Sequence, residues 1–255
     1  MSAIRQGTYS VIAENVFSNC WSVHWPVKGD WTPALLESNI LFRCGSIPSN
    51  SGNYNEWRDA EVRFNVVWCE PGQGVPFLTK KFYGLNDSCR IHHNTFVNVS
   101  HLVLVDNSSS ISWHPRFFDN LIVVDPEGED GRTVFRNNQT AFASGNSSSF
   151  RTGGDGCLMN NAWHAPDGIS GGPATEVAGY DLSAGCLVTN NIALGAPPAF
   201  VSTKIWSPNF CRPAVRNDDW IRPGHAWTND GEYPDWIGAR PAWVPELYRS
   251  LLILR

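Results

Sequence analysis

An asparagine recurs along the first 200 residues, each time between two short apolar stretches. The eight copies are Asn15, Asn39, Asn65, Asn94, Asn120, Asn138, Asn161 and Asn191. Consecutive copies are 24, 26, 29, 26, 18, 23 and 30 residues apart. A period of about 20 to 50 residues is typical of proteins built from stacked structural repeats. The chain is therefore expected to fold by repetition of one unit.

The residues that flank each asparagine follow a fixed pattern. Three residues before it stand the apolar Ile12, Leu36, Val62, Ile91, Phe117, Phe135, Leu158 and Val188. Two residues after it stand Phe17, Leu41, Val67, Phe96, Ile122, Thr140, Trp163 and Ala193, mostly large and apolar. Because side chains alternate along a strand, such positions are expected to line one interior.

Each repeat therefore predicts a short strand, a corner and a second short strand. We place the asparagine at the corner because it tolerates the left-handed backbone conformation better than other non-glycine residues. Its amide can also bond to the asparagines of the coils above and below, which forms a ladder. The segment around Asn138 fits least, because its spacing is 18 residues and Gln139 and Thr140 are polar.

The repeats resemble those of right-handed parallel β-helix proteins of the pectate-lyase-like superfamily. "CRIHHNTFVNV", "PRFFDNLIVV" and "CLVTNNIALG" carry the resemblance best, and it extends over roughly residues 8 to 200. It predicts an all-β, right-handed parallel β-helix (a solenoid) of about eight coils over residues 1–200. An irregular C-terminal capping segment, residues 201–255, is expected to pack on the same domain.

The end of the chain adds to the resemblance. "YPDWIGARP", residues 233–241, is similar to the Pro-Asp-Ile-Gly-Ala ending that follows the last coil in many bacterial members. Here Trp236 is inserted before the isoleucine, and Arg240 stands where those endings usually carry an acidic residue.

Charge and hydropathy restrict the partners. The net charge of −5 and the absence of a basic stripe argue against nucleic-acid binding. No run of about 18 apolar residues is present, so no membrane span is expected. "MSAIRQGTYSV" lacks the apolar stretch of a signal peptide. The resemblance nonetheless implies an extracellular or cell-surface protein in its native context.

The first repeat begins close to the N-terminus, and no amphipathic capping helix precedes it. A solenoid needs cover over its first coil, because its core otherwise meets water. We therefore expect self-association through the first coil, cover by another subunit, or a longer parent protein.

Seven cysteines are present, and none has the spacing of a zinc site. Cys20 and Cys44 each lie five residues after their repeat asparagine, and Cys69 lies four after. Coils stack at about 4.8 Å, so these three side chains are expected to form a row. The row contains either free buried thiols or a disulfide between neighbouring coils.

The resemblance implies that substrate lies on the outward face of the sheet after the second corner, here within 21–25, 74–81 and 100–107. The candidate catalytic residues are Lys80, His101 and His24. Lysine can remove a proton beside a uronate carboxylate, and histidine can donate one. The substrate-binding candidates are Lys81, Trp25, Trp113 and His164. The alternatives are solvated lysines, structural histidines and tryptophans that close the core.

"DPEGEDG" places four carboxylates in one turn, at Asp125, Glu127, Glu129 and Asp130. Oxygen-rich loops of this kind suit Ca²⁺, and a solvated acidic turn is the alternative. We therefore expect either no cofactor or Ca²⁺.

The leading functional prediction is a carbohydrate-active protein, either a polysaccharide lyase or a glycoside hydrolase, acting on an extended polysaccharide. Its enzymatic part rests on analogy of fold. The alternatives are a non-catalytic polysaccharide-binding or tail-fibre-like surface scaffold, and a truncated fragment of a larger enzyme.

Overall fold

The computed structural model describes residues 11–20, 35–44, 55–57, 61–73, 82–85, 90–99, 103–105, 116–127, 135–137, 157–165, 187–214 and 236–240. Two seven-stranded sheets dominate this part of the chain, and every strand pair in them is parallel. The first sheet contains β1 (Val11–Ala13), β3 (Leu35–Glu37), β6 (Glu61–Arg63), β9 (Arg90–His92), β12 (Arg116–Phe118), β15 (Cys157–Met159) and β17 (Leu187–Thr189). The second contains β2 (Val16–Ser18), β4 (Ile40–Phe42), β7 (Val66–Trp68), β10 (Thr95–Val99), β13 (Leu121–Val124), β16 (Ala162–His164) and β18 (Ile192–Ala193).

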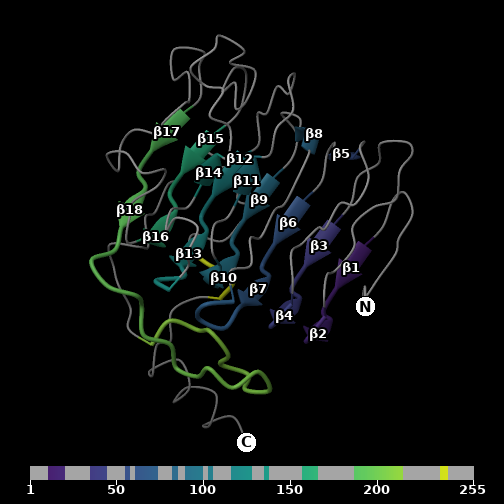
Figure 1. Cartoon of the computed structure of the whole chain (residues 1–255), viewed down its shortest axis with the longest axis vertical. Helices are drawn as coiled ribbons and strands as arrows, with labels where there is room; N and C mark the ends of the chain where they lie inside the picture. The colour runs from purple at the N-terminus through teal and green to yellow at the C-terminus, as the bar shows by residue number, and fades with distance from the viewer. Residues whose placement is uncertain are drawn as a thin grey trace, which may run out of the picture.

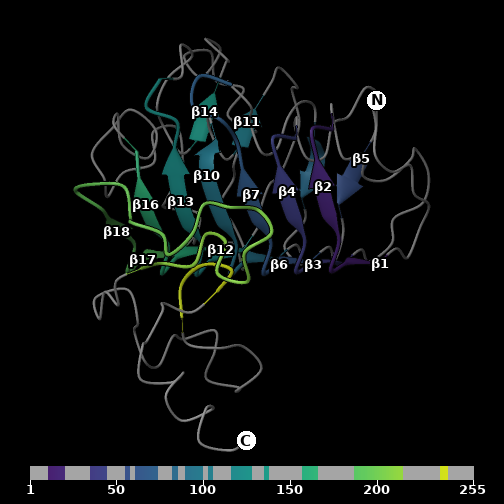
Figure 2. The same ribbon diagram turned by 90° about the horizontal axis from the view of Figure 1, so that it is seen from below.

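The chain alternates between these two sheets, so each coil adds one strand to each of them. Figures 1 and 2 show the coils following one another from β1 and β2 to β17 and β18. Two further parallel pairs are β5 (Asn55–Trp57) with β8 (Phe82–Leu85), and β11 (Val103–Val105) with β14 (Phe135–Asn137). The predicted all-β parallel β-helix is therefore confirmed. In the part of the chain that is described, no helix is long and apolar enough to cross a membrane.

The interior consists of the positions that the repeat predicts. Leu36, Val62, Ile91 and Phe117 lie three residues before a ladder asparagine and are buried in the first sheet. On the second sheet the positions two residues after it are buried at Leu41, Val67, Phe96, Ile122 and Trp163. In-register pairing stacks these residues directly, as in Leu36 against Val62 and Leu41 against Val67.

The asparagines form a continuous hydrogen-bonded ladder between the two sheets. The backbone N–H and Nδ2 of Asn94 both donate to Oδ1 of Asn120, at 3.1 and 3.0 Å. Nδ2 also donates to the carbonyl oxygens of Val62 and His92, each at 2.8 Å. The same pattern joins Asn15, Asn39, Asn65, Asn94, Asn120, Asn161 and Asn191. Each amide thereby satisfies buried backbone groups on two coils.

The left-handed corner residue is not the asparagine itself, so that prediction is wrong. The positive φ belongs to the residue before it, at Glu14, Ser38, Phe64, His93, Asp119, Asn160 and Asn190, with φ between 51° and 58°. The asparagine is selected by its amide, which must reach the next coil. The preceding residue accepts the unfavourable conformation because its N–H bonds to the neighbouring coil, as from Ser38 N–H to Arg63 O at 3.1 Å.

Seven of the eight aligned asparagines form the ladder in the described part of the chain, and the copy left out is Asn138, whose segment fits the repeat least. Asn120 bonds directly to Asn161, which lies 41 residues later. The strand before Asn138, β14, pairs with β11 instead of joining the first sheet. A spacing of 18 residues is shorter than any single coil of the ladder, whose other spacings are 24 to 30 residues. Asn138 itself lies outside the described residues.

The outward face of the second sheet is apolar and covered by later parts of the chain. Phe210, Cys211 and Ala239 form one core cluster with Val66 and Val97. Ile237 packs with Leu121 and Ala162 in a second cluster. At Gly238, with φ of 91°, an added Cβ would meet Thr95 Oγ1 at 2.9 Å and Leu121 Cβ at 3.2 Å. The described parts of the predicted capping segment thus lie along this sheet, and its other residues lie outside the described residues.

Cys20, Cys44 and Cys69 are free thiols, as one of the two sequence interpretations predicts. Cys44 and Cys69 are buried, and Cys20 is partly exposed. Mainly through burial, the pKa of Cys44 is raised to about 11 and that of Cys69 to about 12. Cys211 is a fourth free thiol and the third that is buried.

The ladder should stabilise the centre of the solenoid more than its first coil. Asn94→Ala should lower the free energy of unfolding by about 2 to 4 kcal/mol, because it leaves several buried donors and acceptors without partners. Asn15 is exposed, so Asn15→Ala should cost less than about 1 kcal/mol. Urea unfolding of both variants tests this, and equal losses would contradict the hydrogen-bonded ladder.

The thiols should differ in reactivity because alkylation requires an accessible thiolate. In the folded protein at pH of about 8, iodoacetamide should modify Cys20 well before Cys44, Cys69 and Cys211. Peptide mass spectrometry over a time course measures the order. Labelling after denaturation is the control, and equal rates for Cys20 and Cys44 in the folded state would refute the buried row.

Candidate functional site

Most of the residues that the sequence proposes for chemistry lie outside the described residues. These are Lys80, His101, His24, Lys81, Trp25, Trp113, Glu129 and Asp130. Their roles remain predictions. His164, Asp125 and Glu127 are described.

His164 is partly buried on β16, and its Nδ1 lies 3.0 Å from the carbonyl oxygen of Leu194 on the next coil. Asp125 is fully buried, and both of its carboxylate oxygens accept backbone N–H groups. Oδ2 accepts from Gly72 at 2.8 Å and Oδ1 from Glu127 at 2.9 Å. Asp125 therefore ties two coils together, whereas Glu127 is exposed. No group of three or more potential metal ligands exists among the described residues.

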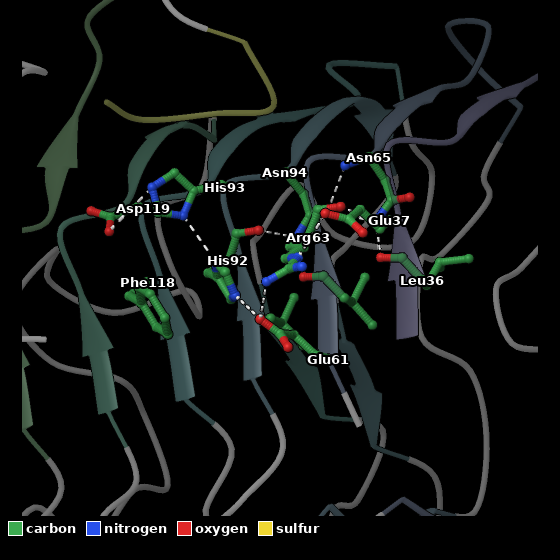
Figure 3. Close-up of polar contacts among 12 residues, drawn as sticks. Leu36, Glu37, Glu61, Arg63, Asn65, His92, His93, Asn94, Phe118 and Asp119 are labelled. Atoms are coloured by element: carbon green, nitrogen blue, oxygen red, sulfur yellow. Dashed lines mark hydrogen bonds and ion pairs between the residues drawn. The ribbon is translucent and has the colours of Figure 1, made fainter. Parts of the chain in front are cut away.

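A cluster of ionisable side chains lies elsewhere, on the outward face of the first sheet and at its corner (Figure 3). Interior residues occupy the middle of each short strand, so the residues on either side of them point outward. Glu37, Arg63 and His92 are in-register neighbours on β3, β6 and β9. Glu61 is on the same face of β6, and His93 and Asp119 are the left-handed corner residues of their coils.

Four of these residues form a chain of contacts that we call the relay cluster: Glu61, His92, His93 and Asp119. Glu61 Oε1 lies 2.9 Å from His92 Nε2. His92 Nδ1 lies 2.8 Å from His93 Nδ1. His93 Nε2 lies 3.8 Å from Asp119 Oδ2, which is longer than a hydrogen bond. The cluster thus joins two carboxyl groups through two imidazoles.

The relay cluster runs from a partly exposed end to a buried end. The side chain of Glu61 is 24% exposed, whereas those of His92, His93 and Asp119 are fully buried. At the exposed end Arg63 donates to Glu61 at 3.1 Å and to Glu37 at 3.0 Å. Among the four residues of the relay cluster, Glu61 is therefore the one that solvent or a ligand can contact.

Aromatic rings enclose the two histidines. Phe118 stacks on the ring of His92, with centroids 4.5 Å apart and planes 4° from parallel. Phe64 contacts His93 at a centroid distance of 5.3 Å. Trp236, from the C-terminal part of the chain, lies edge-on to His93 at 6.5 Å. These rings fix the imidazole planes and keep water away from them.

Burial determines the charge of the inner groups. It lowers the pKa of His92, although the hydrogen bond that His92 donates to Glu61 opposes this shift. It raises the pKa of Asp119 to about 8, because the carboxylate form loses its hydration. At neutral pH His92 is therefore neutral, and Asp119 is mostly protonated.

These charges allow one consistent direction of proton donation. If His92 Nε2 donates to Glu61, then His92 Nδ1 accepts from His93 Nδ1–H. His93 Nε2 is then unprotonated and faces the Asp119 carboxyl group. His92 can therefore exchange a proton with Glu61, which places acid–base chemistry at Glu61. Transfer of the Asp119 proton along the whole chain would require Asp119 first to approach His93, because 3.8 Å is beyond hydrogen-bond distance.

None of the four residues of the relay cluster was predicted from the sequence, although His92 and His93 stand inside the repeat "CRIHHNTFVNV". A usable signal existed. The position two residues before the asparagine holds Glu37, Arg63 and His92 in three successive repeats, which stack on one outward face. Ionisable residues at equal positions of neighbouring coils are therefore worth aligning in any β-helix sequence.

Comparisons of the chain with models of protein families, with curated proteins and with solved structures find no match. The functional argument accordingly rests on the parallel β-helix and on the chemistry of its side chains.

The stability of the protein should depend on the protonation of Asp119. Between pH 6.5 and about 8 the folded state keeps this proton and the unfolded state has lost it. The free energy of unfolding should therefore fall by about 1.4 kcal/mol per pH unit as the pH rises through this range. Below pH 6.5 the lowered pKa of His92 acts in the opposite sense, because the unfolded state then binds the extra proton.

Asp119→Asn should abolish most of the fall above pH 6.5, since the amide does not titrate. Urea unfolding at a series of pH values measures it. Glu14→Gln, at an exposed corner residue, is the matched control and should keep the wild-type profile. An unchanged profile for Asp119→Asn would contradict the buried, protonated carboxyl group.

Proposed function

We propose that the chain is a carbohydrate-active parallel β-helix protein of the pectate-lyase-like superfamily. It binds an extended polysaccharide and cleaves it, as a lyase or a glycoside hydrolase, outside the cell or at its surface. Glu61 is the proposed acid–base residue. The observation that carries this proposal is the contact of a partly exposed carboxylate with a buried, neutral imidazole at 2.9 Å.

Both reactions need a group that exchanges a proton with the sugar. A lyase removes the proton beside the uronate carboxylate, and a hydrolase protonates the leaving oxygen. Glu61 suits either role, because His92 can return or withdraw a proton from behind it. Arg63 supplies a neighbouring positive charge. Perturbed titrations at such a cluster are typical of functional sites and also occur in structural ion networks.

The arrangement of charged groups on the first sheet also supports a polymeric ligand. Glu37, Glu61 and Arg63 are all partly exposed on neighbouring strands, so charged groups recur at the spacing of the coils. A repeating polymer can contact such a row at several points. Lys80 and His101 stay predictions for the same polysaccharide and are independent of this site.

The second candidate is a non-catalytic polysaccharide-binding scaffold. The observation in its favour is the complete burial of His92, His93 and Asp119 beneath aromatic rings. A buried polar network of this kind can fix the register of stacked coils without any reaction. The two candidates differ in whether Glu61 exchanges protons with a bound sugar.

Replacement of Glu61 separates the two candidates. The purified chain is incubated with acidic and neutral polysaccharides, with and without Ca²⁺, while absorbance of unsaturated uronate and new reducing ends are followed. We expect product from the wild type and a loss of about 100-fold or more in kcat for Glu61→Gln. Glu37→Gln, at the other carboxylate bonded to Arg63, should retain kcat within about threefold and affect only KM, because Glu37 contacts the polymer without exchanging a proton with it.

Equal activity of Glu61→Gln and Glu37→Gln would exclude Glu61 as the acid–base residue. Binding of a polysaccharide without any product from the wild type would favour the scaffold. Circular dichroism and urea unfolding of each variant confirm that the chain is folded during the assay.

A further inference from the structure

The most exposed large apolar residue in the described part of the chain is Trp206, at 79%. It lies in residues 199–214, which we call the basic loop, on the outer side of the second sheet (Figure 2). The loop takes no part in the β-helix ladder or in the relay cluster. An exposed tryptophan binds a ligand best when the backbone that contains it is fixed.

The basic loop is closed at its base by hydrogen bonds between its two arms. Val201 N–H donates to Arg212 O at 2.9 Å, Ala214 N–H to Ala199 O at 2.8 Å and Cys211 N–H to Ser202 O at 2.8 Å. The tip is a tight turn, in which Ser207 N–H donates to Lys204 O at 2.9 Å and Phe210 N–H to Ser207 O at 3.0 Å. Trp206 stands inside this turn.

Apolar anchors attach the loop to the sheet. Phe210 is fully buried and contacts the rings of Trp68 and Phe42, with centroids 5.8 and 6.1 Å away. Phe200 contacts Trp68 at 6.5 Å. Phe210 is therefore buried and Phe200 partly buried, whereas Trp206 is exposed to solvent. Because hydrogen bonds already fix the backbone of the loop, little chain has to become ordered when a ligand binds there.

The charged side chains of the basic loop and of residues 236–240, which contact it, are all positive. Residues 199–214 and 236–240 contain Lys204, Arg212 and Arg240 and no aspartate or glutamate, in a chain of net charge −5. Arg240 Nη1 donates to the carbonyl oxygen of Pro208, two residues from Trp206. Arg212 Nη1 lies 3.5 Å from Asn209 Oδ1 on the same turn. Burial lowers the pKa of Arg240, and the positive charge of Arg212 acts in the same direction.

An indole face and nearby cations together select a particular ligand. Tryptophan offers a large flat apolar surface, which suits the apolar face of a sugar ring. Guanidinium and ammonium groups bind carboxylates through charge-assisted hydrogen bonds. A neutral sugar would use only the first feature, and a simple anion only the second. A sugar that bears a carboxylate uses both.

We propose that Trp206, Lys204 and Arg240 form a binding subsite for one uronate unit of an acidic polysaccharide. The sugar ring stacks on the indole, and its carboxylate bonds to the cations. The inference rests on the proposed function, because it takes the ligand to be a polysaccharide, and it adds the acidic class and a second contact point. It does not depend on the reaction at Glu61.

The test is calorimetric titration with a hexamer of galacturonate and, separately, a neutral hexamer of glucose. Titrations use the Glu61→Gln background so that the ligand stays intact. We expect binding of the acidic hexamer, a loss of about tenfold in affinity for Trp206→Ala, and a smaller loss with weaker salt dependence for Lys204→Gln. Val201→Ala, at an exposed apolar residue of the same loop, is the matched control and should bind normally.

Unchanged affinity in Trp206→Ala would overturn the subsite and leave the proposed function intact. Equal binding of the neutral hexamer would overturn the acidic class. Failure of the parent chain to bind either hexamer or any longer polysaccharide would overturn both proposals. Thermal unfolding of each variant verifies that the loop substitutions leave the β-helix folded, since Trp206 and Lys204 are exposed.

Discussion

The rest of the structure depends on the pair of hydrogen bonds that each ladder asparagine donates to the asparagine of the next coil. One Oδ1 atom accepts from both the backbone N–H and the Nδ2 of the previous asparagine, as between Asn65 and Asn94 at 3.0 Å each. The corner between the sheets is buried, so these polar groups would otherwise lack partners. Because the bond links equal positions of neighbouring coils, it also fixes their register. A slip by one residue would break every rung and turn the interior side chains outward.

The ladder also determines which positions place a side chain at the buried corner between the sheets. Each rung places the residue before the asparagine in the left-handed region, next to a buried corner. In two neighbouring coils this residue is His93 and Asp119, so two titratable side chains are held beside each other at the corner. His92 joins them from the adjacent strand. The relay cluster is therefore a consequence of ladder geometry combined with particular residues at two corner positions.

The interior could be predicted from the sequence because the buried residues stand at fixed distances from the ladder asparagine. A local pattern of apolar residues therefore identifies them. The segment around Asn138 shows the limit of that pattern. Its flanks match in part, but whether a coil closes depends on pairing between strands, and β14 pairs with β11. The position of the left-handed residue was missed for a related reason. Propensity favours asparagine there, whereas tertiary hydrogen bonds hold Ser38 and His93 in that conformation.

The candidate site needed more than a local rule. Glu61 and His92 are 31 residues apart, and only the register of β6 against β9 brings them together. The resemblance directed attention to another face, where Lys80 and His101 remain predictions. Asp125 has a structural role that its residue type does not reveal, because its carboxylate accepts two backbone N–H groups and joins two coils. Binding of Ca²⁺ by the acidic turn stays a prediction.

Residues 236–240 connect the two proposed sites across the corner. Trp236 lies against His93, and Gly238 N–H donates to the carbonyl oxygen of Asp119 at 2.8 Å. Ala239 then donates to Thr95 Oγ1 at 2.9 Å on the second sheet, and Arg240 reaches the basic loop at Pro208. A Cβ at position 238 would collide with Thr95, so this segment fits the corner closely. The two ends of this short segment thus contact the two proposed sites, Trp236 at the buried imidazole of His93 and Arg240 at the basic loop.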